Sequence, residues 1–178
     1  NILDPTDHPE NNPRFLLILV AVITAVDKYQ DLLRISVASA GNDHRLGANE
    51  APPAIVSMFI GEELENILSS IERGAKYSEI KAEVLKITSG LIPKFDKDKT
   101  DRNRTSPFAF TGNKFEFRMV GSDMSVSAAN VVINTIVSDV LSDFADELSS
   151  AKDFDAAVID IIRKSYSEHK RIVFNGNN

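Results

Sequence analysis

The sequence predicts a mixed α/β protein of the α+β kind, in which short strands are scattered singly among longer helices. Two long segments, 125–150 and 153–170, place apolar residues at helical spacing. Between the charged middle of the chain and these helices, residues 114–119 alternate charged and apolar side chains, as a strand with one apolar face does. Hydrophobic residues make up 43% of the 178 residues. This length and composition suit one domain with a packed core.

The first predicted helix spans residues 13–38. Asn12 offers a capping oxygen, and Pro13 fixes the backbone φ angle that the first helical position needs. The apolar run 15–26 is shorter than the roughly 20 residues that cross a bilayer, so we interpret it as the buried half of this helix. Gly41 is expected to end the helix.

The middle of the chain is predicted to contain loops, a strand and two helices. Residues 41–53 are rich in Gly and Asn and close with two prolines, which indicates a loop. A β-rich run at 54–61 predicts a strand, and acidic residues open a predicted helix at 62–74. A further helix is predicted at 77–88, followed by a charged loop or ribbon at 94–113. The remaining predicted elements are a strand at 114–119, helices at 125–150 and 153–170, and a short strand within 171–178.

Composition excludes several classes of protein and site. The formal net charge of -6 argues against a general nucleic-acid binder, and no segment is apolar for long enough to span a membrane. The absence of cysteine excludes disulfides and thiolate metal sites and fits a reducing, cytoplasmic location. The three histidines share no metal-ligand spacing, and there is no Gly-rich phosphate loop or serine elbow. A nucleotide would therefore have to be bound through arginines and metal-bound carboxylates.

One face of the predicted strand at 114–119 carries Lys114, Glu116 and Arg118. Two interpretations stay open. An antiparallel sheet often has one wet face, where alternating charges are stable. If the face is instead enclosed, the charges would need partners such as a metal, a phosphate or a carboxylate, because desolvating a charge is costly.

Two other stretches are candidates for binding anions or for closing over a ligand. Arg102 and Arg104 would face the same way in an extended ribbon, and guanidinium groups match phosphate oxygens well. The loop at 41–53 combines flexible residues with a stiff Pro-Pro base, as a closing flap needs, and it contains Arg45 and Glu50. The alternatives are a solvated charged loop and an ordinary surface loop.

Read together, the motifs resemble a known enzyme family. The stretches HRLGANEAPPAI and DRNRTSPFAFTGNKFEFRMVGS are similar to the C-terminal part of the catalytic domain of glutamine synthetase. Their sequences resemble those of the large type III enzymes most. The elements R-L-x-x-x-E-A-P, R-N-R-[ST] and [RK]-x-E-x-R are each weak alone, but their order is specific. The likeness covers nearly the whole chain, including ASAGND and EHKRIVFNGN.

The resemblance implies a metal and nucleotide site. Glu116 matches a carboxylate that ligates one of two active-site Mg²⁺ or Mn²⁺ ions. Arg104 matches an arginine that contacts the nucleotide and stabilises the transferring γ-phosphoryl group. Lys114 stands where a nucleotide-contacting arginine is usual, so its role is carried over as similar. ATP is the implied co-substrate.

The resemblance also implies a glutamate and ammonium site. Arg45 and Arg118 match arginines that bind the substrate glutamate. Glu50 matches the flap glutamate that shields the intermediate and takes a proton from ammonium. In the implied reaction, glutamate attacks the γ-phosphorus of ATP, and ammonia then displaces phosphate from γ-glutamyl phosphate to give glutamine.

The implied architecture is incomplete. We expect a single fragment at 1–178, with antiparallel strands of an incomplete barrel flanked by long helices, a helical insertion at about 61–99, and no N-terminal β-domain or first half of the catalytic domain. This fragment alone is expected to be inactive, and activity to belong to a ring-built homo-oligomer, a dodecamer. The alternatives are a glutamate–amine ligase of the same superfamily and a non-catalytic relative used for assembly.

Overall fold

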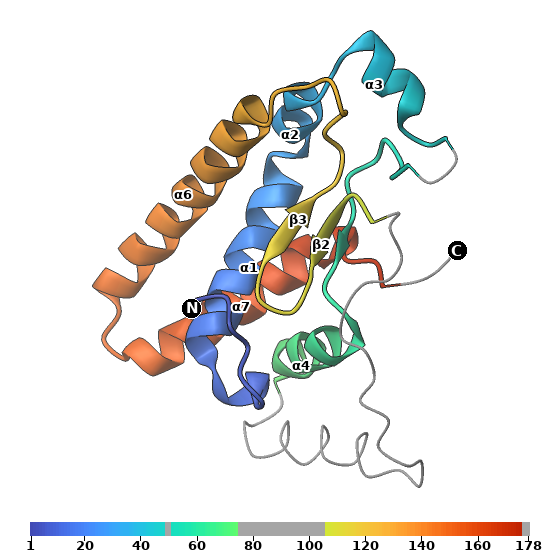
Figure 1. The fold of residues 1–178 in the computed structure, drawn as a ribbon. Coiled ribbons are helices and arrows are strands. Elements are labelled where there is room, and N and C mark those ends of the chain that lie inside the picture. Colours follow the sequence, from blue (N-terminus) through green and yellow to red (C-terminus); the bar gives the residue numbers. More distant parts are fainter. Residues whose placement is uncertain (49–50, 75–105, 176–178) are drawn as a thin grey trace, which may run out of the picture.

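The computed structural model describes residues 1–48, 51–74 and 106–175, and within them it confirms a mixture of helices with a small sheet (Figure 1). The chain enters through a short 3₁₀ helix, η1, at Pro9–Asn11. The α-helices are α1 (Pro13–Lys28), α2 (Gln30–Ser36), α3 (Ala40–Arg45), α4 (Glu62–Glu72), α6 (Ser127–Ser150) and α7 (Phe154–His169). The strands are β1 (Met58–Phe59), β2 (Phe108–Phe110) and β3 (Phe115–Phe117), and η2 (Lys170–Ile172) follows α7.

Helix α1 is the centre of the core. It packs against α6 and α7, and the small sheet lies across it (Figure 1). Asn12 caps it as predicted, because its side-chain oxygen accepts a hydrogen bond from the Phe15 amide at 3.0 Å. Leu19, Val20 and Ile23 are fully buried. The apolar run that could not span a bilayer is thus a core helix, as the sequence predicted.

The predicted single helix at 13–38 is wrong, because α1 and α2 are separate. Tyr29 joins them with φ -120° and ψ 26°, which is outside helical geometry. The Tyr29 hydroxyl donates to the Asp139 carboxylate of α6 at 2.5 Å, and Lys28 donates to the same group at 3.2 Å. These two donors hold the pKa of Asp139 below its ordinary value. The junction is therefore anchored by a neighbouring helix, which periodicity cannot reveal.

The predicted loop at 41–53 is also wrong in its first part, because Ala40–Arg45 forms α3. Ser39 caps this helix by accepting a hydrogen bond from the Asn42 amide at 3.2 Å. Gly41 lies inside α3 and does not end a helix. Gly has low helix propensity, so the cap and the tertiary bonds of Asn42 described below offset its cost.

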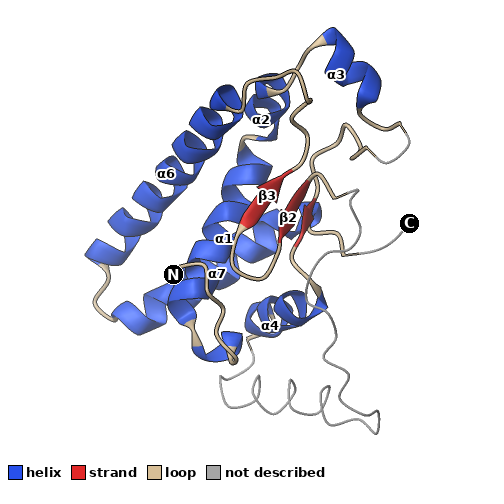
Figure 2. Cartoon of the chain, viewed as in Figure 1, coloured by secondary structure: helices blue, strands red, loops and turns tan. Residues whose placement is uncertain are grey.

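The sheet has the order β1-β2-β3 (Figure 2). β2 and β3 are antiparallel, with Phe108 opposite Phe117 and Phe110 opposite Phe115. β1 and β2 are parallel, which corrects the expectation of antiparallel strands throughout. The strand predicted at 54–61 is reduced to Met58–Phe59, and Met58 forms an isolated bridge with Val173, where a short C-terminal strand was predicted.

The apolar side of the hairpin packs on α1. The four hairpin phenylalanines contact each other with ring centroids 5.1–5.7 Å apart, and Phe110 lies 5.6 Å from Phe15 of α1. This packing confirms the alternation read from the sequence, and it turns the charged residues of β3 away from α1.

Helices α4, α6 and α7 match the predicted helices at 62–74, 125–150 and 153–170. α4 packs against α7, and α6 runs along the opposite side of α1 (Figure 1). None of the helices in the described residues is long and apolar enough to cross a bilayer. The predicted helix at 77–88 and the charged stretch at 94–105 lie outside the described residues.

Candidate functional site

The charged face of β3 forms a row of ion pairs. Lys114 Nζ lies 3.3 Å from Glu116 Oε1, and Arg118 Nη2 lies 3.0 Å from Glu116 Oε2. Side-chain exposure falls along the row, from 64% at Lys114 to 36% at Glu116 and 18% at Arg118. The row is therefore open to solvent at the hairpin turn and largely covered at its other end.

Glu116 is held in its ionised form. The Arg118 guanidinium lowers the pKa of the Glu116 carboxyl most strongly, the Thr111 hydroxyl and the Lys114 ammonium lower it further, and desolvation opposes them. Thr111 donates to Glu116 Oε1 at 3.1 Å. The backbone partner of Glu116 on β2 is Ala109, which is fully buried. Position 116 thus presents a carboxyl group whose ionised form is favoured by two neighbouring cations.

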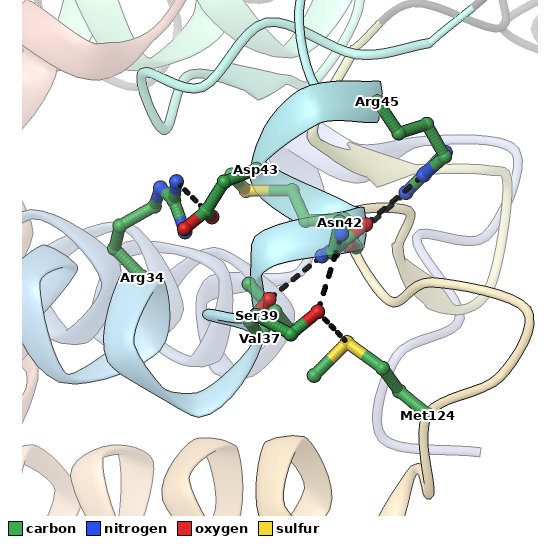
Figure 3. Close-up of polar contacts among 8 residues, drawn as sticks. Arg34, Val37, Ser39, Asn42, Asp43, Arg45 and Met124 are labelled. Atoms are coloured by element: carbon green, nitrogen blue, oxygen red, sulfur yellow. Dashed lines mark hydrogen bonds and ion pairs between the residues drawn. The ribbon is translucent and has the colours of Figure 1, made fainter.

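Arg45 reaches the same strand at its far end. Arg45 Nη2 donates to the backbone oxygens of Met119 at 3.2 Å and Val120 at 3.4 Å, directly after Arg118. Arg45 Nε donates to Asn42 Oδ1 at 3.0 Å (Figure 3). The structure therefore brings the predicted residues Arg45, Glu116 and Arg118 to one strand. It places Arg45 in the last turn of α3, which corrects the flap loop expected for it.

Helix α3 is tied to its surroundings on two sides. Arg34 of α2 forms an ion pair with Asp43 at 2.6 Å, and the Ser39 hydroxyl contacts the sulfur of Met124 at 4.0 Å (Figure 3). Asn42 is 4% exposed and bonds both to Val37 and to Met119. α3 is thus fixed relative to β3, and Arg45 with it.

Sequence reasoning missed Asn42 and Thr111. Ser39 could have indicated a helix that contains Asn42, because the side chain of an N-cap serine accepts a hydrogen bond from the backbone amide three residues later. Thr111 lies in the turn before β3, and nothing in its local sequence marks it as a neighbour of Glu116. Glu50, Arg102 and Arg104 lie outside the described residues, so their predicted convergence on this strand stays a prediction.

The charged row of β3 offers a divalent metal one carboxylate ligand, Glu116. Among residues 1–48, 51–74 and 106–175, no three His, Asp or Glu side chains form a group that could hold a metal ion. Mg²⁺ commonly takes only one or two protein carboxylates and completes its octahedral shell with water and phosphate oxygens. An ionised Glu116 fits that role as a single ligand.

Three curated proteins align with nearly all of the chain. No protein-family model matches the chain. It is 46% identical over 180 residues to the type-3 glutamine synthetase of Dictyostelium discoideum, and this alignment covers 99% of the chain. This chain is homologous to glutamine synthetase. The glutamine synthetases of Bacteroides fragilis and Butyrivibrio fibrisolvens are 44% and 43% identical, again over 99% of the chain.

The homology covers only part of each relative. The chain spans about a quarter of the length of these glutamine synthetases, with coverage of 24%, 25% and 25%. Identity of this level along the whole chain extends beyond the short charged motifs to the helices that support them. The resemblance seen in the motifs is therefore confirmed over 99% of the chain.

Proposed function

We propose that this chain is part of the catalytic domain of an ATP-dependent glutamate–ammonia ligase. The observation that supports the proposal best is the homology to glutamine synthetases along 99% of the chain. In this proposal residues 1–178 are one fragment of that domain, 61–99 is a helical insertion, and the protein works as a ring-built homo-oligomer. ATP and Mg²⁺ or Mn²⁺ are its co-substrate and metal.

The charges of the β3 row suit this reaction. Two anions, the glutamate side chain and the ATP γ-phosphate, must approach each other, which requires cations to offset their repulsion. Glu116 would contribute one carboxylate to a divalent metal, which when bound would neutralise phosphate charge. Arg118 and Arg45 would bind glutamate, and Lys114 the nucleotide. Both arginines are already tied to the strand or to its end.

Two residues outside the described part complete the proposed mechanism. Arg104 would stabilise the transferring phosphoryl group, because a guanidinium fork matches its oxygens. Glu50 would shield the acyl phosphate from water and take a proton from ammonium, which becomes nucleophilic only once deprotonated. Residues of this chain would thus carry out the acid–base step. The metal ions would need further carboxylate ligands besides Glu116.

The test uses the complete polypeptide that carries this chain. We expect it to form glutamine from glutamate, ammonium and ATP with Mg²⁺ or Mn²⁺, and Glu116→Ala to abolish turnover and weaken metal-dependent ADP binding. Glu72→Ala is the matched control, since Glu72 of α4 pairs with Lys170 of η2, away from β3. Near-normal turnover of Glu116→Ala would remove the metal assignment.

Further arms of the same experiment separate the alternatives. Product formation with another amine and not with ammonium would indicate a different glutamate–amine ligase. Absence of metal-dependent ADP binding would indicate a non-catalytic assembly protein. The isolated 178-residue chain is expected to form no glutamine, and detectable product from it would contradict the proposal that activity belongs to the assembled, complete protein.

A further inference from the structure

We propose that Asn42 is a positioning residue whose carboxamide fixes the Arg45 guanidinium against the end of β3, so that the carboxylate of the substrate meets a pre-oriented cation. The inference rests on the proposed function, in which Arg45 binds glutamate. It assigns a role to a buried side chain that does not itself touch substrate.

The hydrogen bonds of Asn42 leave its amide one orientation. Both protons of Nδ2 are used, one on Val37 O at 2.7 Å and one on Met119 O at 2.8 Å. Oδ1 must then point the other way, where it accepts from Arg45 Nε at 3.0 Å (Figure 3). Only a side chain with two donors and one acceptor satisfies all three groups. A carboxylate would set negative oxygens against two carbonyls.

Within the described part of the chain, the hydrogen-bond acceptors that hold Arg45 are neutral. Its Nε bonds to the Asn42 amide oxygen, and its Nη2 bonds to the carbonyls of Met119 and Val120. In the described part of the chain no carboxylate lies within ion-pair distance of Arg45. The guanidinium is therefore fixed in direction while its positive charge remains uncompensated by these neighbours. A pre-oriented cation loses less conformational entropy when an anion binds.

Met119 O joins the two side chains into one unit. It accepts from both Asn42 Nδ2 and Arg45 Nη2, so movement of the Asn42 amide would change the position of the carbonyl that Arg45 uses. Gly121 closes the other side of Asn42. A Cβ placed on Gly121 would lie 3.1 Å from Asn42 Oδ1, which is tighter than ordinary contact. A methyl group there would displace Asn42 without removing any hydrogen-bonding atom.

The experiment compares Asn42→Leu, Asn42→Asp and Gly121→Ala in the complete polypeptide. Asn42→Leu removes all three bonds at similar volume, and Asn42→Asp removes both donors but keeps an acceptor for Arg45. Losing hydrogen bonds that orient a charged ligand group should raise the KM for glutamate about tenfold in the two Asn42 variants. Gly121→Ala should raise it less. The KM for ATP should stay within about twofold in all three, because the cation affected is not the one assigned to ATP.

Asp43→Asn is the matched control. It removes the ion pair of α3 with Arg34, and none of the described contacts of Asp43 reaches Arg45. It should leave both KM values unchanged. If Asp43→Asn raises the KM for glutamate as much as Asn42→Leu, Asn42 only stabilises α3 and the proposal is overturned. Equal rises in both KM values, or no rise in the Asn42 variants, overturn it too.

A structural readout separates this proposal from the proposed function. Electron cryomicroscopy of Asn42→Leu should show the Arg45 guanidinium released from Met119 O. If the wild-type protein forms no glutamine, the proposed function fails, while this readout still tests whether Asn42 orients Arg45. If the wild-type protein is active and Arg45 keeps its position in the variant, only the positioning role fails.

Discussion

Glu116 has a carboxyl group whose charge depends on its neighbours. Arg118 is the main cause of its lowered pKa, and Thr111 and Lys114 contribute less. Because the pKa is lowered in the folded protein, the ion pairs contribute stability above the ordinary pKa of a glutamate, and this is lost as the pH falls through the folded value. The neighbours of Glu116 therefore favour its carboxylate form, which the proposed metal role requires.

We predict that Arg118→Gln raises the pKa of Glu116 toward its ordinary value. Lys114→Gln should raise it less, because Lys114 is the more exposed and weaker partner. The shift can be followed by ¹³C NMR on protein labelled at glutamate, with Glu116→Gln used to assign the resonance. An equal rise in the two variants would show that Arg118 does not dominate the electrostatics of this carboxylate.

Single residues also show where sequence reasoning succeeds. The alternation at 114–119 predicted which side chains of β3 share a face, because a strand repeats every two residues regardless of context. It could not predict that Arg45 bonds to Met119 O, since the two are 74 residues apart. Asn42 went unnoticed for the same reason, because its most informative partner is 77 residues away.

At the scale of elements, a buried carboxylate joins the ends of α1 and α7. Asp27 of α1 has a side-chain exposure of 2%, lies 2.8 Å from His169 Nδ1 and accepts a hydrogen bond from Arg171 Nε at 2.9 Å. The C-terminal turn η2 is thereby fixed to the central helix.

We predict that Asp27→Ala destabilises this junction by roughly 1.5–3 kcal/mol, the usual cost of losing hydrogen bonds to a charged group. Glu72→Ala is the control, because it removes the more exposed pair with Lys170, next to His169 in sequence, and should cost only about 0.2–1 kcal/mol. Urea-dependent hydrogen exchange of peptides from α1 and α7 measures both effects. Comparable losses in the two variants would contradict a special role for the buried carboxylate.

The elements that were predicted and those that were not differ in what determines them. Helices α1 and α7 carry a capping residue and apolar spacing, and α6 carries apolar spacing alone; all three begin or run where these local signals place them. The break at Tyr29 and the short helix α3 depend on contacts with α6, α2 and the end of β3. Propensity alone favours a continuous helix at Tyr29 and a stop at Gly41, and tertiary contacts override both.

At the scale of the whole molecule, the C-terminal segment ties the sheet to α4. Phe174 N donates to Met58 O at 2.9 Å, which places this segment beside β1. Gly61 is the N-cap of α4 and has no side chain to accept from the exposed amides. Asn175 instead bonds to the backbone directly before the helix, not to the amides of the first turn. Its Oδ1 accepts from Ile60 N at 3.0 Å and Gly61 N at 2.8 Å, and its Nδ2 donates to Glu65 at 2.6 Å.

We predict that Asn175→Ala loosens the backbone that leads into α4, at a cost of about 0.5–1.5 kcal/mol for each hydrogen bond lost. Hydrogen exchange at Ile60 and Gly61 should quicken in the complete polypeptide, while exchange in α6 stays unchanged. Phe174→Ala is the control, because its half-exposed side chain is removed while its backbone bond to Met58 persists. Quicker exchange in both variants alike would mean that the docking of the whole C-terminal segment, and not the Asn175 carboxamide in particular, holds α4 to the sheet. The backbone bond from Phe174 to Met58 is kept in both variants, so the two side chains would then act together by keeping the segment beside β1.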